Sequence, residues 1–323
     1  MIPHIIWMFW HNPDPPELVM RCVRRVRDVN PTWRVTLLSL EMVRSITPLP
    51  HCADVIGPEH ISDWVRLYFV STFGGVWLDI TTVHISPMET WIREDASVSA
   101  PETLYGFGSP WDPTIMETWA FAAPRNSEFM EHWLQRFNEA LSMGFAQYMD
   151  KHRADVPDSL APHLPYLTIN FCWVLACRAW PAVCIKTLPS TTDGGPFALH
   201  DACGWNEETL AQRLCQEPHS ALSDTDLRFF IKLRGIDRGA CLRLMDANNF
   251  TDDSLMAVVL GYRTPPILEN QIESWIPSPP QWTYATQSAC YHPTKRGMLL
   301  LLAACMVSSI LICSVSQQQQ DEH

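Results

Sequence analysis

The stretch that decides the fold runs from residue 61 to residue 81 and reads ISDWVRLYFVSTFGGVWLDIT. It opens with apolar side chains at helical spacing after Ser62, a residue type that often caps the N-terminus of a helix. Gly74 follows where a C-terminal helix cap belongs, and the apolar run 76–78 is typical of a short buried strand. We therefore expect a helix capped at Ser62 and Gly74, then a strand with Asp79 at its carboxyl end.

The residues before this stretch predict a strand, a helix and a second strand. Residues 2–9 form an apolar run of strand type, and the prolines at 15–16 precede a helical pattern that stops at Asn30-Pro31. Residues 34–40 alternate in the manner of a strand. This order opens the α/β sheets that bind nucleotides, whose ligands lie beyond the carboxyl ends of the strands. We expect one such domain over residues 1–264.

Composition limits the possible functions. The chain has 323 residues, of which 47% are hydrophobic and 18% charged, so it can build a large core and is not predominantly disordered. Its formal net charge of -12 disfavours nucleic acid as a partner, because that binding depends on neutralising phosphates. The 11 cysteines include no C-x-x-C pair, which argues against a zinc ribbon and favours buried free thiols.

The C-terminal part of the chain has a different character from the rest. Residues 265–296 are rich in proline and predict an extended linker. The charge-free, apolar segment 297–315 is long enough for a transmembrane helix, with a buried core helix as the alternative, and 316–323 form a polar tail. Lys295 and Arg296 precede the apolar segment. Basic flanks face the cytoplasm, so we expect a single-pass C-terminal anchor carrying a cytoplasmic domain.

Several blocks of the sequence together resemble the capsular polysaccharide synthesis family. Ser-Asp-x-x-Arg at 62–66, followed by Gly-Gly-x-Trp-x-Asp-x-Thr at 74–81, is similar to the signature of that family. The opening residues 2–10 and the block Asn-Pro-Thr-Trp at 30–33 look like its first two blocks. Weaker similarity continues through residues 117–123, 194–196 and 230–233. Members of the family are glycosyltransferases related to the DXD sugar-binding group, which includes yeast Golgi mannosyltransferases and the glucosyltransferase domains of clostridial toxins.

The resemblance implies a fold, a reaction and a cofactor. The fold would be GT-A, a Rossmann-like nucleotide-sugar domain. The reaction would move a sugar from a UDP- or GDP-sugar to a glycan or another acceptor, with retention of the anomeric configuration. A divalent cation, Mn²⁺ or Mg²⁺, would neutralise the leaving diphosphate, as bound cations do in phosphate chemistry.

The resemblance also suggests which residues would form the site. Asp79 would bind the metal ion, and Thr81 stands where many relatives carry the second carboxylate of the DXD triplet. Asp63 would bind hydroxyl groups of the donor sugar, and Arg66 would reach its sugar or phosphate, so Asp79, Arg66 and Asp63 are the expected catalytic residues. The alternative for Asp63 and Arg66 is a helix-surface salt bridge, since they lie three residues apart.

Two further residues complete the expected donor and metal sites. Trp7 corresponds to the strand tryptophan that stacks on the nucleotide base in the family, with a core tryptophan as the alternative. His200 lies in a late loop of the kind that completes the metal or diphosphate site in related enzymes, although a lone loop histidine is often incidental. Asp112 and Glu117 flank a stretch that could face the acceptor.

Two other classes of function stay open. With a threonine in place of a carboxylate, the chain could be a catalytically weak homologue that binds a sugar nucleotide or glycan. It could also be a tail-anchored scaffold without a ligand. We find no pair of carboxylates typical of a glycoside hydrolase.

Overall fold

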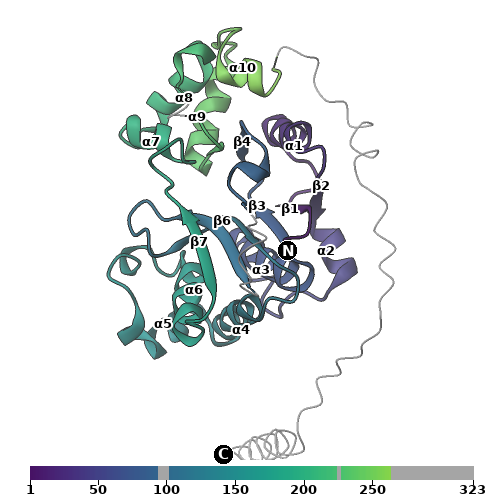
Figure 1. The fold of residues 1–323 in the computed structure, drawn as a ribbon, viewed down its shortest axis with the longest axis vertical. Helices are drawn as coiled ribbons and strands as arrows, with labels where there is room; N and C mark the ends of the chain where they lie inside the picture. The colour runs from purple at the N-terminus through teal and green to yellow at the C-terminus, as the bar shows by residue number, and fades with distance from the viewer. Residues whose placement is uncertain (94–101, 224–226, 263–323) are drawn as a thin grey trace, which may run out of the picture. The chain divides into compact units, whose positions relative to one another are not determined.

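The computed structural model describes residues 1–93, 102–223 and 227–262 (Figure 1). The linker, the membrane helix and the polar tail expected after residue 264 lie outside these residues and stay predictions. Within the described ranges, no helix combines the length and the apolar character that crossing a bilayer requires.

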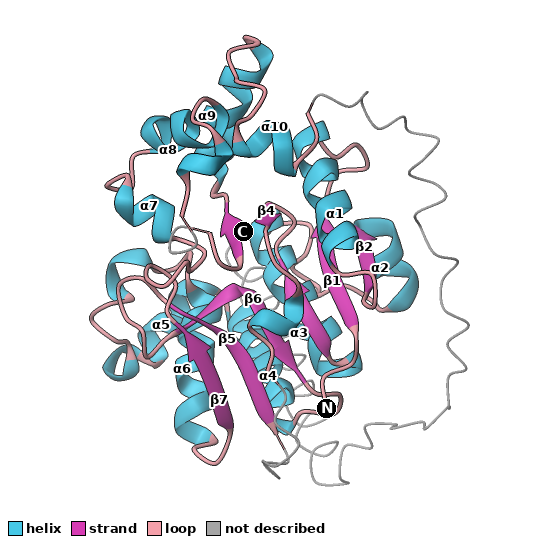
Figure 2. Ribbon diagram, turned by 45° about the horizontal axis from the view of Figure 1, so that its top comes forward, coloured by secondary structure: helices cyan, strands magenta, loops and turns pink. Residues whose placement is uncertain are grey.

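A mixed β-sheet lies at the centre of the described domain (Figure 2). The strands are β1 (Ile5–Trp10), β2 (Arg34–Ser39), β3 (Gly75–Leu78), β4 (Thr82–His84), β5 (Thr103–Gly108), β6 (Met116–Ala123), β7 (Cys184–Leu188) and β8 (Phe230–Lys232). The large sheet has the order β2-β1-β3-β6-β5-β7. Its β1 pairs in parallel with β2 and β3, β6 is antiparallel to β3 and β5, and β7 is parallel to β5. The predicted α/β class is confirmed, and β4 and β8 form a small second sheet.

Helices cover both faces of the large sheet. They are α1 (Glu17–Val29), α2 (Leu40–Ile46), α3 (Pro58–Phe73), α4 (Glu128–Met143), α5 (Phe145–Lys151), α6 (Thr168–Ala179), α7 (Ala198–Ala202), α8 (Glu207–Cys215), α9 (Gly235–Asp246) and α10 (Leu255–Val259). Helices α3, α4 and α6 lie on one side, and α1 lies on the other with β4 and helices α7 to α10 beyond it (Figure 1). Val19, Val23 and Val26 of α1 pack in the core cluster of the sheet, while Leu18 and Cys22 pack in a second cluster with residues of helices α7 to α10.

The expected strand–helix–strand opening is confirmed, and one cap is corrected. Helix α3 begins at Pro58 with Gly57 as its N-cap, so the prediction of Ser62 as the cap is wrong. Proline favours the first helical position because its φ already suits a helix and its missing N–H is not needed there. Ser62 instead accepts a hydrogen bond from Arg66 Nη2 at 3.2 Å. The helix ends at Gly74, as predicted.

Two glycines fix how β3 leaves α3. Gly74 and Gly75 have φ angles of +66° and +98°, a region that side chains with a Cβ rarely adopt. A Cβ on Gly75 would lie 2.6 Å from the carbonyl oxygen of Ile5 in the neighbouring strand β1. The bare backbone therefore lets β3 lie tightly against β1, and this pairing sets the position of Asp79.

Replacing Gly75 with alanine should lower the free energy of unfolding by at least about 1–2 kcal/mol, because the left-handed conformation and the contact with Ile5 both oppose a Cβ. The control is Gly239→Ala in α9, where the added Cβ has room. That change should leave stability equal or raise it by about 0.5–1 kcal/mol. Urea denaturation of both variants makes the comparison, and equal stability of the two would contradict the assignment.

Candidate functional site

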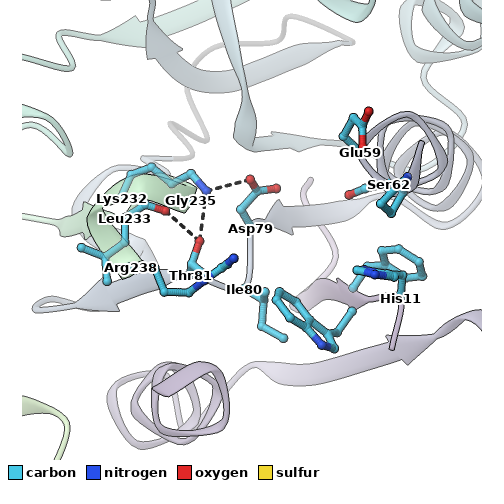
Figure 3. A pocket seen from close by; sticks show the side chains of 13 residues that line it. His11, Glu59, Ser62, Asp79, Ile80, Thr81, Lys232, Leu233, Gly235 and Arg238 are labelled. Atoms are coloured by element: carbon cyan, nitrogen blue, oxygen red, sulfur yellow. Dashed lines mark hydrogen bonds and ion pairs between the residues drawn. The ribbon is translucent and has the colours of Figure 1, made fainter. Parts of the chain in front are cut away.

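A pocket of about 270 Å³ opens where β1 and β3 end (Figure 3). Four segments line it: the end of β1, the first turns of α3, the β3–β4 link, and the junction of β8 with α9. Their lining residues are Phe9, Trp10, His11, Pro58, Glu59, Ser62, Asp79, Ile80, Thr81, Lys232, Leu233, Gly235 and Arg238. The site lies beyond the carboxyl ends of parallel strands, as the sequence predicted.

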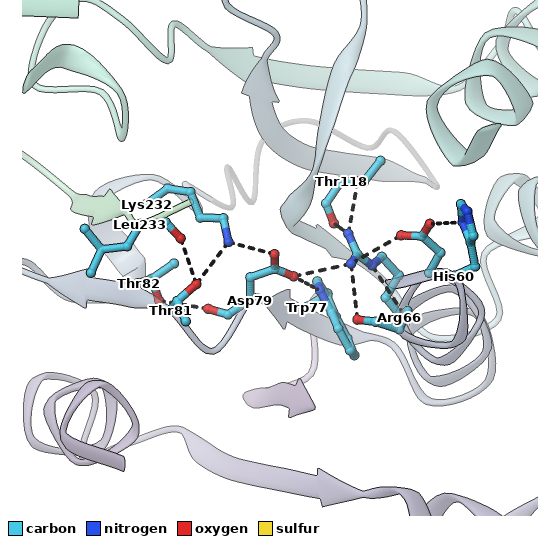
Figure 4. A network of polar contacts seen from close by, with 11 residues as sticks. His60, Arg66, Trp77, Asp79, Thr81, Thr82, Thr118, Lys232 and Leu233 are labelled. Carbon is cyan, nitrogen blue, oxygen red and sulfur yellow. Dashed lines mark hydrogen bonds and ion pairs between the residues drawn. The ribbon is translucent and has the colours of Figure 1, made fainter. Parts of the chain in front are cut away.

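Asp79 lies at the centre of the polar contacts around this pocket (Figure 4). Its Oδ1 accepts a hydrogen bond from Trp77 Nε1 at 3.0 Å and lies 3.4 Å from Arg66 Nη2. Its Oδ2 accepts a hydrogen bond from Lys232 Nζ at 2.8 Å. Burial raises the pKa of Asp79, but the charges of Lys232 and Arg66 outweigh burial and bring this pKa below its usual value. The side chain is therefore a carboxylate at neutral pH, and it is 23% exposed.

The pairing of β4 with β8 brings Lys232 to this carboxylate. The antiparallel register places Lys232 opposite Thr82, and the N–H of Leu233 donates to the carbonyl of Thr81 at 2.9 Å. The hydroxyl of Thr81 donates to the carbonyl of Leu233 at 2.9 Å and accepts from Lys232 Nζ at 3.2 Å. One ammonium group thus contacts both Asp79 and Thr81.

Arg66 and Asp63 form the other side of the same network. Arg66 Nη1 donates to the carbonyl and the hydroxyl of Thr118 at 2.9 and 3.0 Å, and Arg66 Nη2 lies 3.3 Å from Asp63 Oδ1. Asp63 Oδ2 lies 3.3 Å from His60 Nδ1. Both predicted residues are buried, and they stand behind Asp79 rather than on the pocket wall. Their contact with a donor stays a prediction.

Trp7 is a core residue, so the prediction that it stacks on a nucleotide base is wrong. Its side chain is 2% exposed and packs against Phe69 and Phe73 of α3, and its Nε1 donates to the carbonyl of Gly74 at 2.9 Å. Side chains alternate along a strand, and this one points to the α3 face. The aromatic residues of β1 that line the pocket are Phe9 and Trp10, at the end of the strand.

His200 also lies away from the pocket wall, in α7, and we correct its assignment as a metal ligand. Its ring is fully buried, and Nε2 lies 2.9 Å from Asp237 Oδ2. Asp237 also accepts bonds from the backbone N–H and the guanidinium of Arg234, at 2.8 and 2.7 Å, where α9 begins. His200 therefore supports the start of α9, and burial is the main cause that lowers its pKa.

The residues around Asp79 do not fit a divalent cation well. Such a cation takes several oxygen ligands, yet the oxygens of Asp79 and Thr81 already bind an ammonium group. Two unit charges 4 Å apart near a protein surface interact by about 4 kcal/mol. A divalent cation would be repelled by the Lys232 ammonium twice as strongly as a monovalent cation at the same distance. Among the described residues, no group of three or more His, Cys, Asp or Glu side chains is arranged to hold a metal ion.

Sequence reasoning did not single out three residues that the structure places at the pocket: Lys232, Arg238 and Trp10. The guanidinium of Arg238 lies 5.4 Å from the centre of the Trp10 ring, and it makes no ion pair within the described part of the chain. The N-terminus of α9, at Gly235, faces the same pocket. Lys232 lies in the block 230–233, which resembles the family. That resemblance does not indicate what role its lysine has.

Glu117 of β6 is a buried carboxyl group whose pKa is affected by the charges of Lys232 and Asp79. Its side chain is 7% exposed, and burial raises its pKa to about 7, although the charge of Lys232 lowers it and that of Asp79 raises it. Asp112, by contrast, lies in a loop and bonds Thr114 and Ser159. Of these two carboxyl groups, Glu117 is the one whose pKa depends on charged residues of the pocket.

The comparisons with known proteins confirm the expected resemblance. Residues 1–144 match the family described as capsular polysaccharide synthesis protein. The O-glycosyltransferase braB of Annulohypoxylon truncatum is 28% identical over 184 residues, which are 50% of this chain and 42% of that protein. Among solved structures, the PaToxG glycosyltransferase aligns with a TM-score of 0.36 and 13% identity, over 56% of this chain and 78% of its own.

The curated relative is named as an O-glycosyltransferase, which agrees with the class of protein that the sequence analysis expected. The chain spans less than half of the length of the curated relative that it matches. The matched family region contains α3, β3 and Asp79, whereas Lys232 and α9 lie beyond it. The site thus combines residues from the segment that matches the family with residues from the C-terminal half of the described domain.

The raised pKa of Glu117 should make stability depend on pH. The folded protein holds a proton on Glu117 up to about pH 7, whereas the unfolded chain releases it near 4.5. The folded state therefore binds more protons between these values, and this contribution to stability is lost as pH rises through 7. Glu117→Gln, which stays neutral, should gain about 1–3 kcal/mol relative to the wild type between pH 5 and pH 8.

Urea denaturation at both pH values measures this difference. Glu131→Gln, at an exposed position of α4, is the control and should show a much smaller change. A pH dependence of Glu117→Gln equal to that of the wild type would show that Glu117 is already ionised in the folded protein.

Proposed function

We propose that the protein is a glycosyltransferase that transfers a sugar from a nucleotide-sugar donor to a glycan or another acceptor. The observation that carries the proposal is the buried network that holds the Asp79 carboxylate at the pocket, beyond the carboxyl ends of β1 and β3. The family match over residues 1–144 and the similarity to an O-glycosyltransferase support it. The mixed α/β sheet is consistent with a GT-A-like domain.

The charges at the pocket support a diphosphate-containing donor. Lys232 and Arg238 supply two cations, and the N-terminus of α9 adds the positive end of a helix dipole. Trp10 offers an aromatic face to a base or a sugar ring. We propose a UDP- or GDP-sugar, because the diphosphate of either would meet these groups. The pocket volume is close to the lower limit of about 300 Å³ for small-molecule sites.

The finer features of the reaction rest on the resemblance. Retention of the anomeric configuration is part of the proposal, and NMR of the product's anomeric proton would read it directly. A divalent cation bound by Asp79, Thr81 and His200 was the expectation from the sequence. We do not build a step on it, because Lys232 contacts the first two residues and the third lies in the core.

The membrane location is a proposal that rests on the sequence alone. We propose that residues 297–315 anchor the protein, with the domain before them in the cytoplasm, on the grounds of Lys295 and Arg296. Protease added to sealed membranes should then digest the domain, and Asn249 should carry no glycan. A protected domain with a glycan on Asn249 would show the opposite orientation.

Asp79→Asn should reduce sugar transfer, or donor hydrolysis without an acceptor, by at least tenfold. The change removes a charge from bonds to Lys232 and Arg66, and a charge-assisted bond contributes about 1.5–3 kcal/mol. The control is Asp150→Asn in α5, which breaks an exposed ion pair with Arg153 and should leave turnover unchanged.

A thermal-shift screen of UDP- and GDP-sugars on the full chain precedes the kinetic assay and identifies the donor. Stabilisation by a donor that is never hydrolysed or transferred would favour the catalytically weak sugar-nucleotide binder instead. The absence of any shift and any turnover would reject the proposed function.

A further inference from the structure

We propose that the ammonium group of Lys232 takes the place of a divalent cation in this site, so that donor binding and transfer need no metal ion. The inference rests on the proposed function and deepens it. It names the group that neutralises the leaving diphosphate, and it reverses the cofactor requirement that the sequence led us to expect.

Lys232 Nζ contacts both of the residues that the sequence led us to expect as metal ligands in this pocket (Figure 4). Nζ lies 2.8 Å from Asp79 Oδ2 and 3.2 Å from Thr81 Oγ1, the two residues whose spacing predicted a metal site. A cation that bridged these oxygens would have to displace this ammonium group. The positive charge that the site requires is therefore supplied by the chain itself.

Lys232 is held in place by both its backbone and its side chain. The side chain is 11% exposed, and the backbone of Lys232 is fixed by the pairing of β8 with β4. An ammonium group has three hydrogen-bond donors, and Asp79 and Thr81 accept two of them. Lys232 also lines the pocket, so one donor remains for an oxygen atom of a ligand.

A second cation and a helix N-terminus stand beside Lys232. Arg238 lies one turn into α9, and Gly235 begins that helix; both line the pocket (Figure 3). A diphosphate that bridges Lys232 and Arg238 would meet two positive charges, the same charge that one divalent metal ion provides. Glu59 lines the pocket from α3, on the far side from Lys232, so it does not compete for this ammonium group.

The transfer step balances without a metal ion. The bond between the anomeric carbon of the sugar and the β-phosphate oxygen breaks, and its electron pair stays on that oxygen. The acceptor hydroxyl oxygen bonds the anomeric carbon, and its proton passes to the departing diphosphate. Lys232 remains an ammonium throughout and donates to the oxygen on which charge develops, as preorganised donors do at such positions. Asp79 then acts as a positioning residue for Lys232.

The test compares nucleotide binding with and without metal in the full-length protein. UDP and GDP are titrated by calorimetry into the wild type in EDTA and again in Mn²⁺, and hydrolysis of the matching sugar nucleotides is measured in both. We expect the dissociation constants in the two conditions to agree within about threefold, and hydrolysis to persist in EDTA. Electron paramagnetic resonance of free Mn²⁺ should show no uptake by the protein without nucleotide.

Two variants identify the group responsible. Lys232→Met should weaken binding of the nucleotide in EDTA by at least tenfold, while Lys232→Arg, which keeps the charge, should retain part of it. Lys151→Met is the matched control, because Lys151 pairs with Glu139 on the surface, away from the pocket; it should bind as the wild type does. Circular dichroism and thermal melting establish that each variant is folded.

The possible outcomes separate the two proposals. Binding and hydrolysis that occur only with Mn²⁺ would overturn the role of Lys232 and leave the proposed glycosyltransferase function standing. Wild-type binding in EDTA that Lys232→Met leaves unchanged would overturn it as well. Failure of the wild type to bind or hydrolyse any nucleotide in either condition would reject both proposals. The comparison within the wild type stands even if Lys232→Met does not fold.

Discussion

A partly buried carboxylate between two buried cations is the interaction on which the site depends. Asp79 lies between Arg66 of α3 and Lys232 of β8, and neither cation is free to leave because each is held by its own element. Burying charges is costly unless they are paired and hydrogen-bonded, so the three groups stabilise one another only as a set. Loss of one would leave the others desolvated and unbalanced, and the pocket wall would lose its shape with them.

The α3–β3 unit could be predicted from the sequence because its signals are local. Helical spacing, the glycines after Phe73 and a short apolar run give the helix, the turn and the strand, and the strand then places Asp79. The predicted N-cap of α3 was wrong because the sequence holds two residues typical of a helix start, Pro58 and Ser62, four positions apart. The proline, whose backbone already suits a first turn, takes precedence there.

Other parts of the site depend on relations that one sequence does not contain. Whether Trp7 or Trp10 faces the pocket is a question of which side of β1 meets α3, and a fully apolar strand gives no alternation to decide it. Lys232 reaches Asp79 through the register of two three-residue strands, β4 and β8, which carry almost no pattern. His200 looked like a loop ligand because its partner, Asp237, lies 37 residues further on.

The contact between Asp79 and Lys232 spans 153 positions of the chain, and this separation has a consequence for biogenesis. Chains emerge from the ribosome N-terminus first, and closing a long loop delays the contacts that depend on it. The parallel part of the sheet can assemble while Asp79 still lacks its second cation. The pocket is therefore complete only after β8 and α9 have been synthesised and docked, so its assembly depends on completion of the whole domain.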